Sequence, residues 1–167
     1  NNLQTADKET GKEKEEETLA EVVSLVEEPQ DETDHPPVPS LDNCDLSELD
    51  LSDLDFLSIS IQNANLTKAI LNRANLSNSS LVKTSLANAN LNDTNLSETD
   101  LSDANLSQAI LEGANLEGSL LNRANLSDAM LERANLRKCK LIESNLTNAN
   151  LNEVTCGLAD FSRSDLK

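Results

Sequence analysis

A period of five residues runs through the chain from position 44 to position 167 and restricts the folds that it can adopt. Every fifth residue from 46 to 166 is apolar: 21 of these 25 positions are Leu, and the others are Phe56, Ile61, Cys156 and Phe161. Two residues earlier stands a second series, in which 12 of 25 positions are Ala and nine are Ser, Thr or Cys. The residue directly before the large one is Asn or Asp in 16 of 25 units.

A period of five matches neither the 3.6-residue period of a helix nor the two-residue period of a strand. A helix would point the Leu side chains in all directions, and a flat strand would alternate them between its two faces. The chain must therefore turn once in every unit and point one large and one small apolar side chain the same way. A coil that closes on itself meets this requirement, with successive coils stacked about 4.8 Å apart.

The units 64–68 (Ala-Asn-Leu-Thr-Lys) and 104–108 (Ala-Asn-Leu-Ser-Gln) resemble the A-(D/N)-L-x-x motif of the pentapeptide-repeat family, which is common in cyanobacteria. The resemblance covers residues 44–167. It implies an all-β fold, a right-handed quadrilateral β-helix with one unit on each side, 20 residues in each coil and about six coils. One column of the solenoid core would then contain Leu66, Leu86, Leu106, Leu126 and Leu146.

Charged residues spaced by 20 support four sides. One such column alternates in sign throughout: Lys83, Asp103, Arg123, Glu143 and Arg163. A second column alternates over Asp53, Arg73 and Asp93, and resumes at Arg133 and Glu153 after Gly113. We expect neighbouring coils to form ion pairs at these positions.

Residues 1–43 form a separate region with 13 acidic and three basic residues. This composition predicts a largely disordered tail or linker. A short helix is expected over 18–28, with Thr18 as its cap, Glu21 three residues on and Pro29 beyond its end. Its apolar face leaves two alternatives open: a nascent helix within the tail, or a helix that caps the solenoid or docks on a partner.

The two ends of a solenoid expose unpaired strand edges. Large residues are expected to plug both ends: Leu49, Leu54, Phe56 and Ile59 at the N-terminal end, and Val154, Leu158 and Phe161 at the other. The alternative is that these residues form a homodimer through one end of the solenoid.

The sequence offers no catalytic machinery. The inward positions of 44–167 carry no ionisable residue other than Cys, and this region contains no His. We therefore expect a protein that is not an enzyme, with no catalytic residues, metal ligands or cofactors. The three cysteines, Cys44, Cys139 and Cys156, are dispersed and odd in number, which fits neither a disulfide framework nor a zinc site.

The sequence gives only weak indications of the cellular compartment. No stretch approaches the roughly 20 apolar residues of a membrane span, and no apolar signal region opens the chain. Unpaired thiols favour the cytoplasm. Because the first residue is not Met, the chain is expected to be processed or to be part of a longer protein.

The favoured function is a protein-interaction or structural scaffold, either alone or as an accessory module of a longer protein. Its candidate partner-binding residues are Ile70, Ile110 and Met130, which share one outward column; Val82, Leu120 and Ile142 lie on the opposite side.

The alternative is an acidic mimic of DNA, because the resemblance includes members that bind DNA gyrase in this way. Its candidate surface is Asp93, Glu98, Asp100 and Asp103. The net charge of −17 disfavours direct binding of nucleic acid. The columns of alternating charge favour the scaffold, because opposite charges on neighbouring coils cancel much of the negative electrostatic field of the solenoid.

Overall fold

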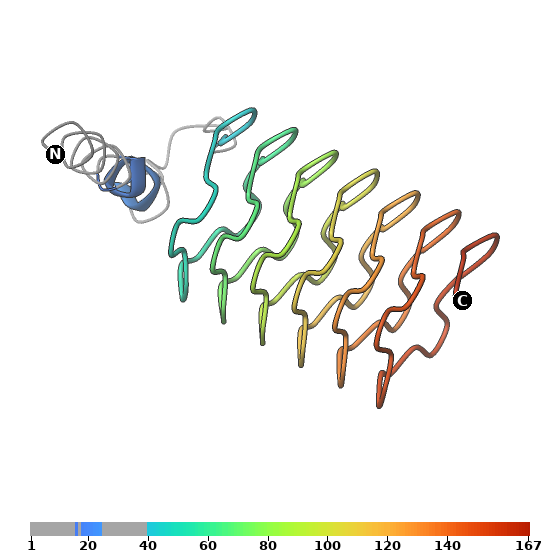
Figure 1. Ribbon diagram of the computed structural model, residues 1–167. Helices are drawn as coiled ribbons and strands as arrows, with labels where there is room; N and C mark the ends of the chain where they lie inside the picture. The colour runs from blue at the N-terminus through green and yellow to red at the C-terminus, as the bar shows by residue number, and fades with distance from the viewer. Residues whose placement is uncertain (1–15, 17, 25–39) are drawn as a thin grey trace, which may run out of the picture.

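The computed structural model describes residues 16, 18–24 and 40–167. Residues 16 and 18–24 are helical, and residues 40–167 form a stack of coils (Figure 1). Parallel bridges join residues 20 apart, from the pair Ser40 and Ser60 to the pair Asn145 and Asp165. The expected four-sided coil of 20 residues is therefore present. Over 40–167 each side pairs through a single bridged residue rather than an extended strand, because the chain turns again directly after it.

Each corner of the coil is a β-turn. At one corner the amide of Ala69 donates a hydrogen bond of 3.0 Å to the carbonyl of Leu66, and Lys68 between them has a φ of 60°. The same left-handed conformation recurs at every fifth residue from Asn43 to Arg163. It costs a residue other than Gly roughly 1–2 kcal/mol. The stacked coils hold the corner nevertheless, because the Lys68 amide also donates to the carbonyl of Ala87 at 2.9 Å.

The hydrogen bonds of one unit account for all five of its amides. In unit 104–108 four amides donate to backbone carbonyls, three of which belong to neighbouring coils. The fifth, that of Ser107, donates to the side chain of Asn105 at 3.2 Å. Buried backbone groups must be paired in this way, so the ladder between coils is what permits so narrow a core.

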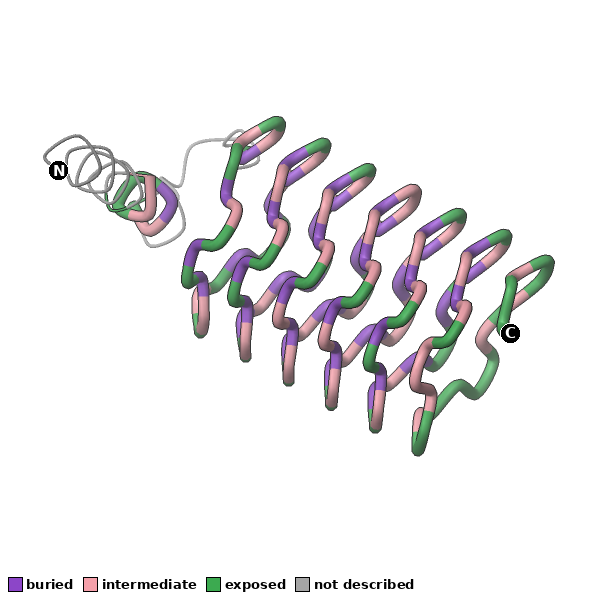
Figure 2. The backbone as a smooth tube through the Cα atoms, in the orientation of Figure 1, coloured by how far each residue is buried: buried purple, intermediate pink, exposed green. Residues whose placement is uncertain are grey.

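Buried residues alternate with partly buried and exposed ones around each coil (Figure 2). The Leu column predicted from the sequence is no more than 1% exposed. Its members are Leu66, Leu86, Leu106, Leu126 and Leu146. Small polar residues inside the coil are also paired: the hydroxyl of Thr84 donates to the carbonyl of Ile61 at 2.6 Å, and that of Thr94 to Leu71 at 2.7 Å.

The helix lies at the N-terminal end of the stack (Figure 1). Its Val22 is 1% exposed and belongs to the same apolar cluster as Leu41 and Leu46 of the first coil. The helix therefore covers this end. This agrees with the sequence-based alternative in which the helix caps the solenoid. Thr18 is not its cap, because Glu16 is already helical. Residues 25–28, the predicted end of the helix, lie outside the described residues.

Among the described residues the ladder already includes Ser40, inside the segment that the sequence assigned to the tail, and Leu41 is buried. Ser40 pairs with Ser60 like every later rung, which extends the solenoid toward the helix. The expectation of a disordered tail concerns residues that lie mostly outside the described part of the chain.

The predicted end plugs differ between the two ends. Near the N-terminal end Phe56 and Ile59 are at most 2% exposed, and Leu49 is 7% exposed, whereas Leu54 is only partly buried. At the other end Val154 and Phe161 are partly buried. Leu158 was wrongly predicted as a plug: it is 85% exposed, because it occupies an outward corner of the coil.

The first prediction tests the inward register. Leu106→Asp should prevent cooperative folding, because it buries a carboxylate in an apolar core at a cost above about 4 kcal/mol. Ser107→Asp, one residue on and partly exposed, should change the melting temperature by only a few degrees. Thermal melts followed by circular dichroism give the comparison, and similar melting temperatures for the two variants would contradict this register.

The second prediction tests the helical cap. Val22→Asp should lower the free energy of unfolding by about 1–3 kcal/mol, since it removes the apolar contact with the first coil. Ala20→Asp is the matched control, because Ala20 lies on the exposed side of the same helix. Urea unfolding measures both variants. Equal stability of the two would show that the helix does not stabilise the solenoid.

Candidate functional site

Two opposite sides of the solenoid carry ladders of asparagine side chains. On one side each side-chain amide donates to the side-chain oxygen one coil earlier: Asn135 to Asn115 at 2.9 Å, Asn115 to Asn95 at 3.2 Å. The ladder continues through Asn75 and ends on Asp55, an acceptor without a donor hydrogen, at 2.8 Å. These sides are thus occupied by hydrogen bonds of the fold itself.

Ion pairs join neighbouring coils at the corners. Arg73 pairs with Asp53 at 2.6 Å and Arg123 with Asp103 at 2.7 Å. Arg163 pairs with Glu143 at 2.9 Å. Three of the neighbouring pairs in the predicted columns of alternating charge are therefore ion pairs. Hydrogen bonds from the Arg123 guanidinium hold the pKa of Asp103 below its ordinary value.

A third side carries the predicted apolar column. Ile70 and Met130 are 36% and 41% exposed, and Ile110 is partly buried. Parallel bridges place Ile70, Asn90, Ile110 and Met130 on four consecutive coils. The structure thus brings the three candidate binding residues together in one row.

The side opposite is more polar. Its bridged residues are Ser80, Asp100, Leu120 and Lys140 on consecutive coils. Val82 and Ile142 lie in turns rather than in this row, and both are partly buried. The predicted apolar set on the opposite side is therefore not a continuous row.

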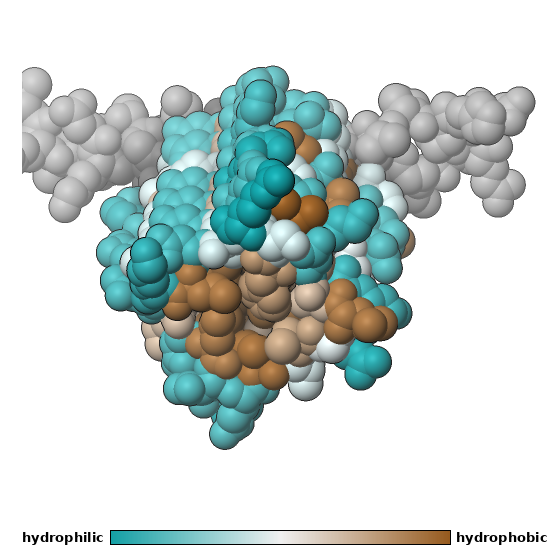
Figure 3. Space-filling model, turned by 90° about the vertical axis from the view of Figure 1, so that its right-hand side faces the viewer, coloured by the Kyte–Doolittle hydropathy of each residue, from teal (hydrophilic) through white to brown (hydrophobic). Residues whose placement is uncertain are grey.

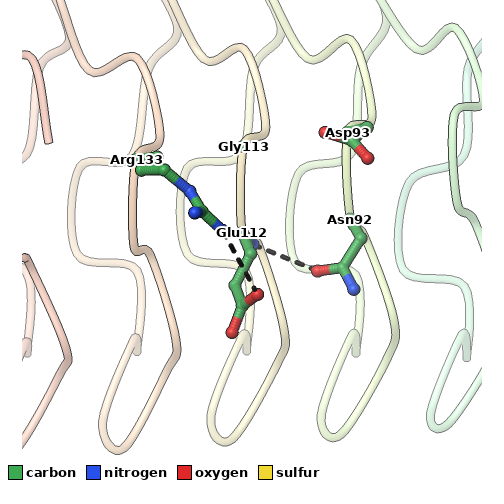
Figure 4. Close-up of a pocket in the computed structure, with 5 residues that line it drawn as sticks. All are labelled: Asn92, Asp93, Glu112, Gly113 and Arg133. Atoms are coloured by element: carbon green, nitrogen blue, oxygen red, sulfur yellow. Dashed lines mark hydrogen bonds and ion pairs between the residues drawn. The ribbon is translucent and has the colours of Figure 1, made fainter. Parts of the chain in front are cut away.

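A notch interrupts the corner beside the apolar row (Figure 4). Gly113 stands where the neighbouring coils have Asp93 and Arg133, and a Cβ at Gly113 would lie 2.6 Å from the Asp93 carboxylate. Without a partner at position 113, Arg133 reaches Glu112 at 4.0 Å instead. The amide of Glu112 donates to the side chain of Asn92 at 3.2 Å. The result is a pocket whose lining includes the charged residues Asp93, Glu112 and Arg133.

Next to the same row lies an unpaired acceptor. The side-chain oxygen of Asn72 is buried and has no hydrogen-bond partner among the described residues. The equivalent oxygen of Asn92, one coil later, accepts the amide of Glu112. The sequence did not indicate a role for Asn72 or Glu112. Their role depends on which backbone amide of one coil donates to an asparagine side chain of the coil before it.

The alternative acidic set is not brought together. Asp93, Glu98 and Asp103 are five residues apart and occupy successive corners, and Asp100 lies on a side between two of them. They therefore spread around the rod rather than along it. Asp103 is also paired with Arg123 by two hydrogen bonds of 2.7 Å.

The remaining chemistry of the described residues is sparse. Cys139 is buried, its thiol donates to the carbonyl of Leu116 at 2.9 Å, and burial raises its pKa. Cys139 is thus a packing residue. Among residues 16, 18–24 and 40–167 no cluster of three or more His, Cys, Asp or Glu could hold a metal ion. The described helix is too short and too polar to cross a membrane.

The family model for pentapeptide repeats matches residues 59–98, 69–108, 99–137 and 131–167, which is more than half of the chain. The chain belongs to the pentapeptide-repeat family. The family consists of solenoid proteins, and its right-handed quadrilateral β-helix agrees with the 20-residue pairing described above. No curated protein matches the chain.

Solved structures of the same family resemble the chain. A pentapeptide repeat protein from the Arabidopsis thaliana thylakoid lumen is 26% identical, with a TM-score of 0.56 over 57% of this chain and 66% of that one. Rfr23 from the cyanobacterium Cyanothece 51142 is 29% identical over 74% of this chain and 91% of that one, with a TM-score of 0.49. A protein of Nostoc PCC 7120 is 43% identical over 45% of this chain and 62% of that one, with a TM-score of 0.45.

The third prediction tests the asparagine ladder. Asn115→Asp should cost about 1–2 kcal/mol at neutral pH, because two acceptors then face each other where Asn115 now donates to Asn95. Asn63→Asp, the same change at an exposed corner, is the control. The opposing acceptor raises the pKa of the introduced carboxyl, and its protonated form donates again. The loss should therefore shrink as the pH falls through that pKa, and a loss that does not depend on pH would contradict the ladder.

Proposed function

We propose that this protein is a non-catalytic scaffold rod that binds a protein partner through the side carrying Ile70, Ile110 and Met130. The observation that carries the proposal is the row itself. On two of the other sides the bridged residues form asparagine ladders, and on the last they are mainly polar.

The row is not needed for the fold. At a bridged position an Asn stabilises the ladder, with each hydrogen bond contributing about 0.5–1.5 kcal/mol. Ile and Met side chains cannot make these hydrogen bonds, and they expose apolar surface to water. Met130 is 41% exposed. Side chains that weaken the ladder and expose apolar area are better explained by a contact with another molecule.

The spacing of the row suits a partner helix. Coils about 4.8 Å apart place Ile70 and Met130 roughly 14 Å from each other along the rod. A helix rises by about 5.4 Å in each turn, so about three turns span the row, and Asn90 lies between Ile70 and Ile110. Central apolar anchors surrounded by polar residues are typical of binding hot spots, and here the polar surround includes Asn72 and Glu112.

The DNA-mimic alternative, with DNA gyrase as its target, finds less support. A mimic needs unpaired acids aligned along the rod. Asp53, Asp103 and Glu143 are each paired with an arginine one coil away. A contact through this row is compatible both with a stand-alone rod and with an accessory module of a longer protein.

The fourth prediction tests the row. A photo-crosslinking residue at position 110 should capture one discrete protein in source cells, and Ile110→Lys with Met130→Lys should abolish recovery of that protein. The matched control is Ser80→Lys with Leu120→Lys, which adds the same charge to the opposite side. All variants should keep their melting transition.

Two outcomes would count against the scaffold. If the control pair abolished capture as fully as the Ile110 and Met130 pair, the row would not be the contact. If the purified protein inhibited gyrase supercoiling at micromolar concentration, and neutralising Asp93, Glu98, Asp100 and Asp103 relieved the inhibition, the DNA-mimic alternative would replace it.

A further inference from the structure

At several corners of the rod an acidic residue pairs with a basic residue at the same corner of the next coil. These pairs are Glu48 with Lys68, Asp53 with Arg73, Asp103 with Arg123, and Glu143 with Arg163. Asp93 departs from this pattern, because Gly113 occupies the corresponding corner of the next coil. The Asp93 carboxylate consequently has no hydrogen bond or ion pair with any residue that the structure describes.

The notch at Gly113 leaves room beside this carboxylate (Figure 4). The pocket has a volume of about 230 Å³ and is also lined by Glu112 and Arg133. Pockets for whole small molecules usually measure about 300–1,000 Å³. The notch is smaller, so it suits one long side chain better than a free ligand.

The notch borders the apolar row, because Ile110 and Gly113 belong to the same five-residue unit. Viewed along the rod, mainly hydrophilic residues cover the outside of the coil and apolar ones lie inside it (Figure 3). The row is an exception to this arrangement, since Ile70 is 36% exposed and Met130 is 41% exposed. A partner that lies on the row can therefore reach the notch with a side chain.

The corners on both sides of the row are acidic from the coil of Asn90 to the coil of Met130. They carry four acids and one base, a net of −3: Asp93, Glu112, Asp128 and Glu132 with Arg133. Beside Ile70, by contrast, the charges are basic and are each paired with an acid of the coil before. The surface around the second half of the row therefore favours a cationic partner and disfavours an acidic one.

We propose that the partner segment is a basic amphipathic helix, one of whose arginine or lysine side chains enters the notch over Gly113 and pairs with Asp93 and Glu112. This inference rests on the proposed function, because it names the chemistry of the partner that binds the row. The apolar face of the helix covers Ile110 and Met130. The cation takes the place that an arginine of the chain itself takes at other corners.

Arginine matches the notch best. Its aliphatic stem packs against apolar surface while its guanidinium extends to the polar edge. The guanidinium donates several hydrogen bonds in a fixed plane and can bind carboxylates with two of them at once. Within the chain, Arg73 binds Asp53 in this way, with hydrogen bonds of 2.7 and 2.6 Å.

Arg133 does not prevent a second cation from entering. Its guanidinium lies 4.0 Å from the carboxylate of Glu112 and also 4.0 Å from that of Glu132. Neither contact is as short as the 2.6–2.9 Å of the other corner pairs. Arg133 can therefore stay beside Glu132 while the partner's cation binds Glu112 and Asp93.

Selection from a displayed library of helical peptides on the 1–167 chain tests the chemistry of the partner. Each peptide has about 18 residues, or five turns, with a fixed apolar stripe and random residues beside it. Peptides that bind the chain should be enriched in Arg and Lys beside the stripe. The same peptides should not bind the variant with Ile110→Lys and Met130→Lys.

Gly113→Arg supplies the cation from the chain itself. An arginine tolerates such a corner, as Arg73 shows with a φ of 59°, and the Asp93 side chain can turn to pair with it. The variant should keep its melting transition and weaken the binding of the selected peptides roughly tenfold, measured by fluorescence anisotropy. Gly118→Arg is the matched control, because Gly118 stands next to Glu98 in the same way but does not border the row. It should leave the binding unchanged.

Asp93→Asn removes the charge without filling the notch. It should weaken the selected peptides about three- to tenfold, because the partner's cation loses its carboxylate. This variant keeps the test decisive if an arginine at position 113 disturbs the fold.

Four outcomes would overturn the inference. Selected peptides that need Ile110 and Met130 but are not enriched in basic residues, or that bind Gly113→Arg and Asp93→Asn as tightly as the original chain, would overturn it and leave the proposed function standing. Enrichment of Asp and Glu would show that Arg133 anchors the partner instead. Peptides that bind the Ile110 and Met130 double variant equally well would contradict both the inference and the proposed row. A library that yields no binding peptide would overturn the inference alone.

Discussion

The parallel pairing of residues 20 apart is the interaction on which the rest of the structure depends. It supplies carbonyl partners for the amides that a five-residue turn would leave unpaired, such as those of Leu106 and Gln108. It also holds non-glycine residues in a left-handed corner conformation that they would avoid in isolation. The narrow core of Leu, Ala and small polar residues can fold because this ladder, rather than a large apolar volume, fixes the backbone.

The same ladder explains where a function can reside. Inward positions are committed to packing, and two sides are committed to asparagine hydrogen bonds. Departures from the repeat are therefore informative, since the fold does not require them. The departures on the outward positions are the apolar row of Ile70, Ile110 and Met130 and the notch at Gly113. A binding role fits each of them better than a catalytic one.

Much of the fold could be predicted from the sequence because the repeat is strictly local. The five-residue period predicted the inward Leu column, and the alternating charges predicted contacts such as Arg123 with Asp103. Other features depend on neighbours distant in the sequence. The burial of Val22 depends on its packing against the first coil. The side-chain oxygen of Asn72 is unpaired because the Asn92 amide donates to the side chain of Asn90 instead. Leu158 was misplaced because its size outweighed its corner position in the prediction.

Amide hydrogen exchange, read residue by residue, tests the pairing of coils most directly. We predict a five-residue pattern in which amides such as that of Ser107, bonded only to a side chain, exchange faster than their four neighbours. Protection should be strong at Leu106 and Leu126, whose amides donate to carbonyls of the next coil. Protection without a five-residue period would contradict the account.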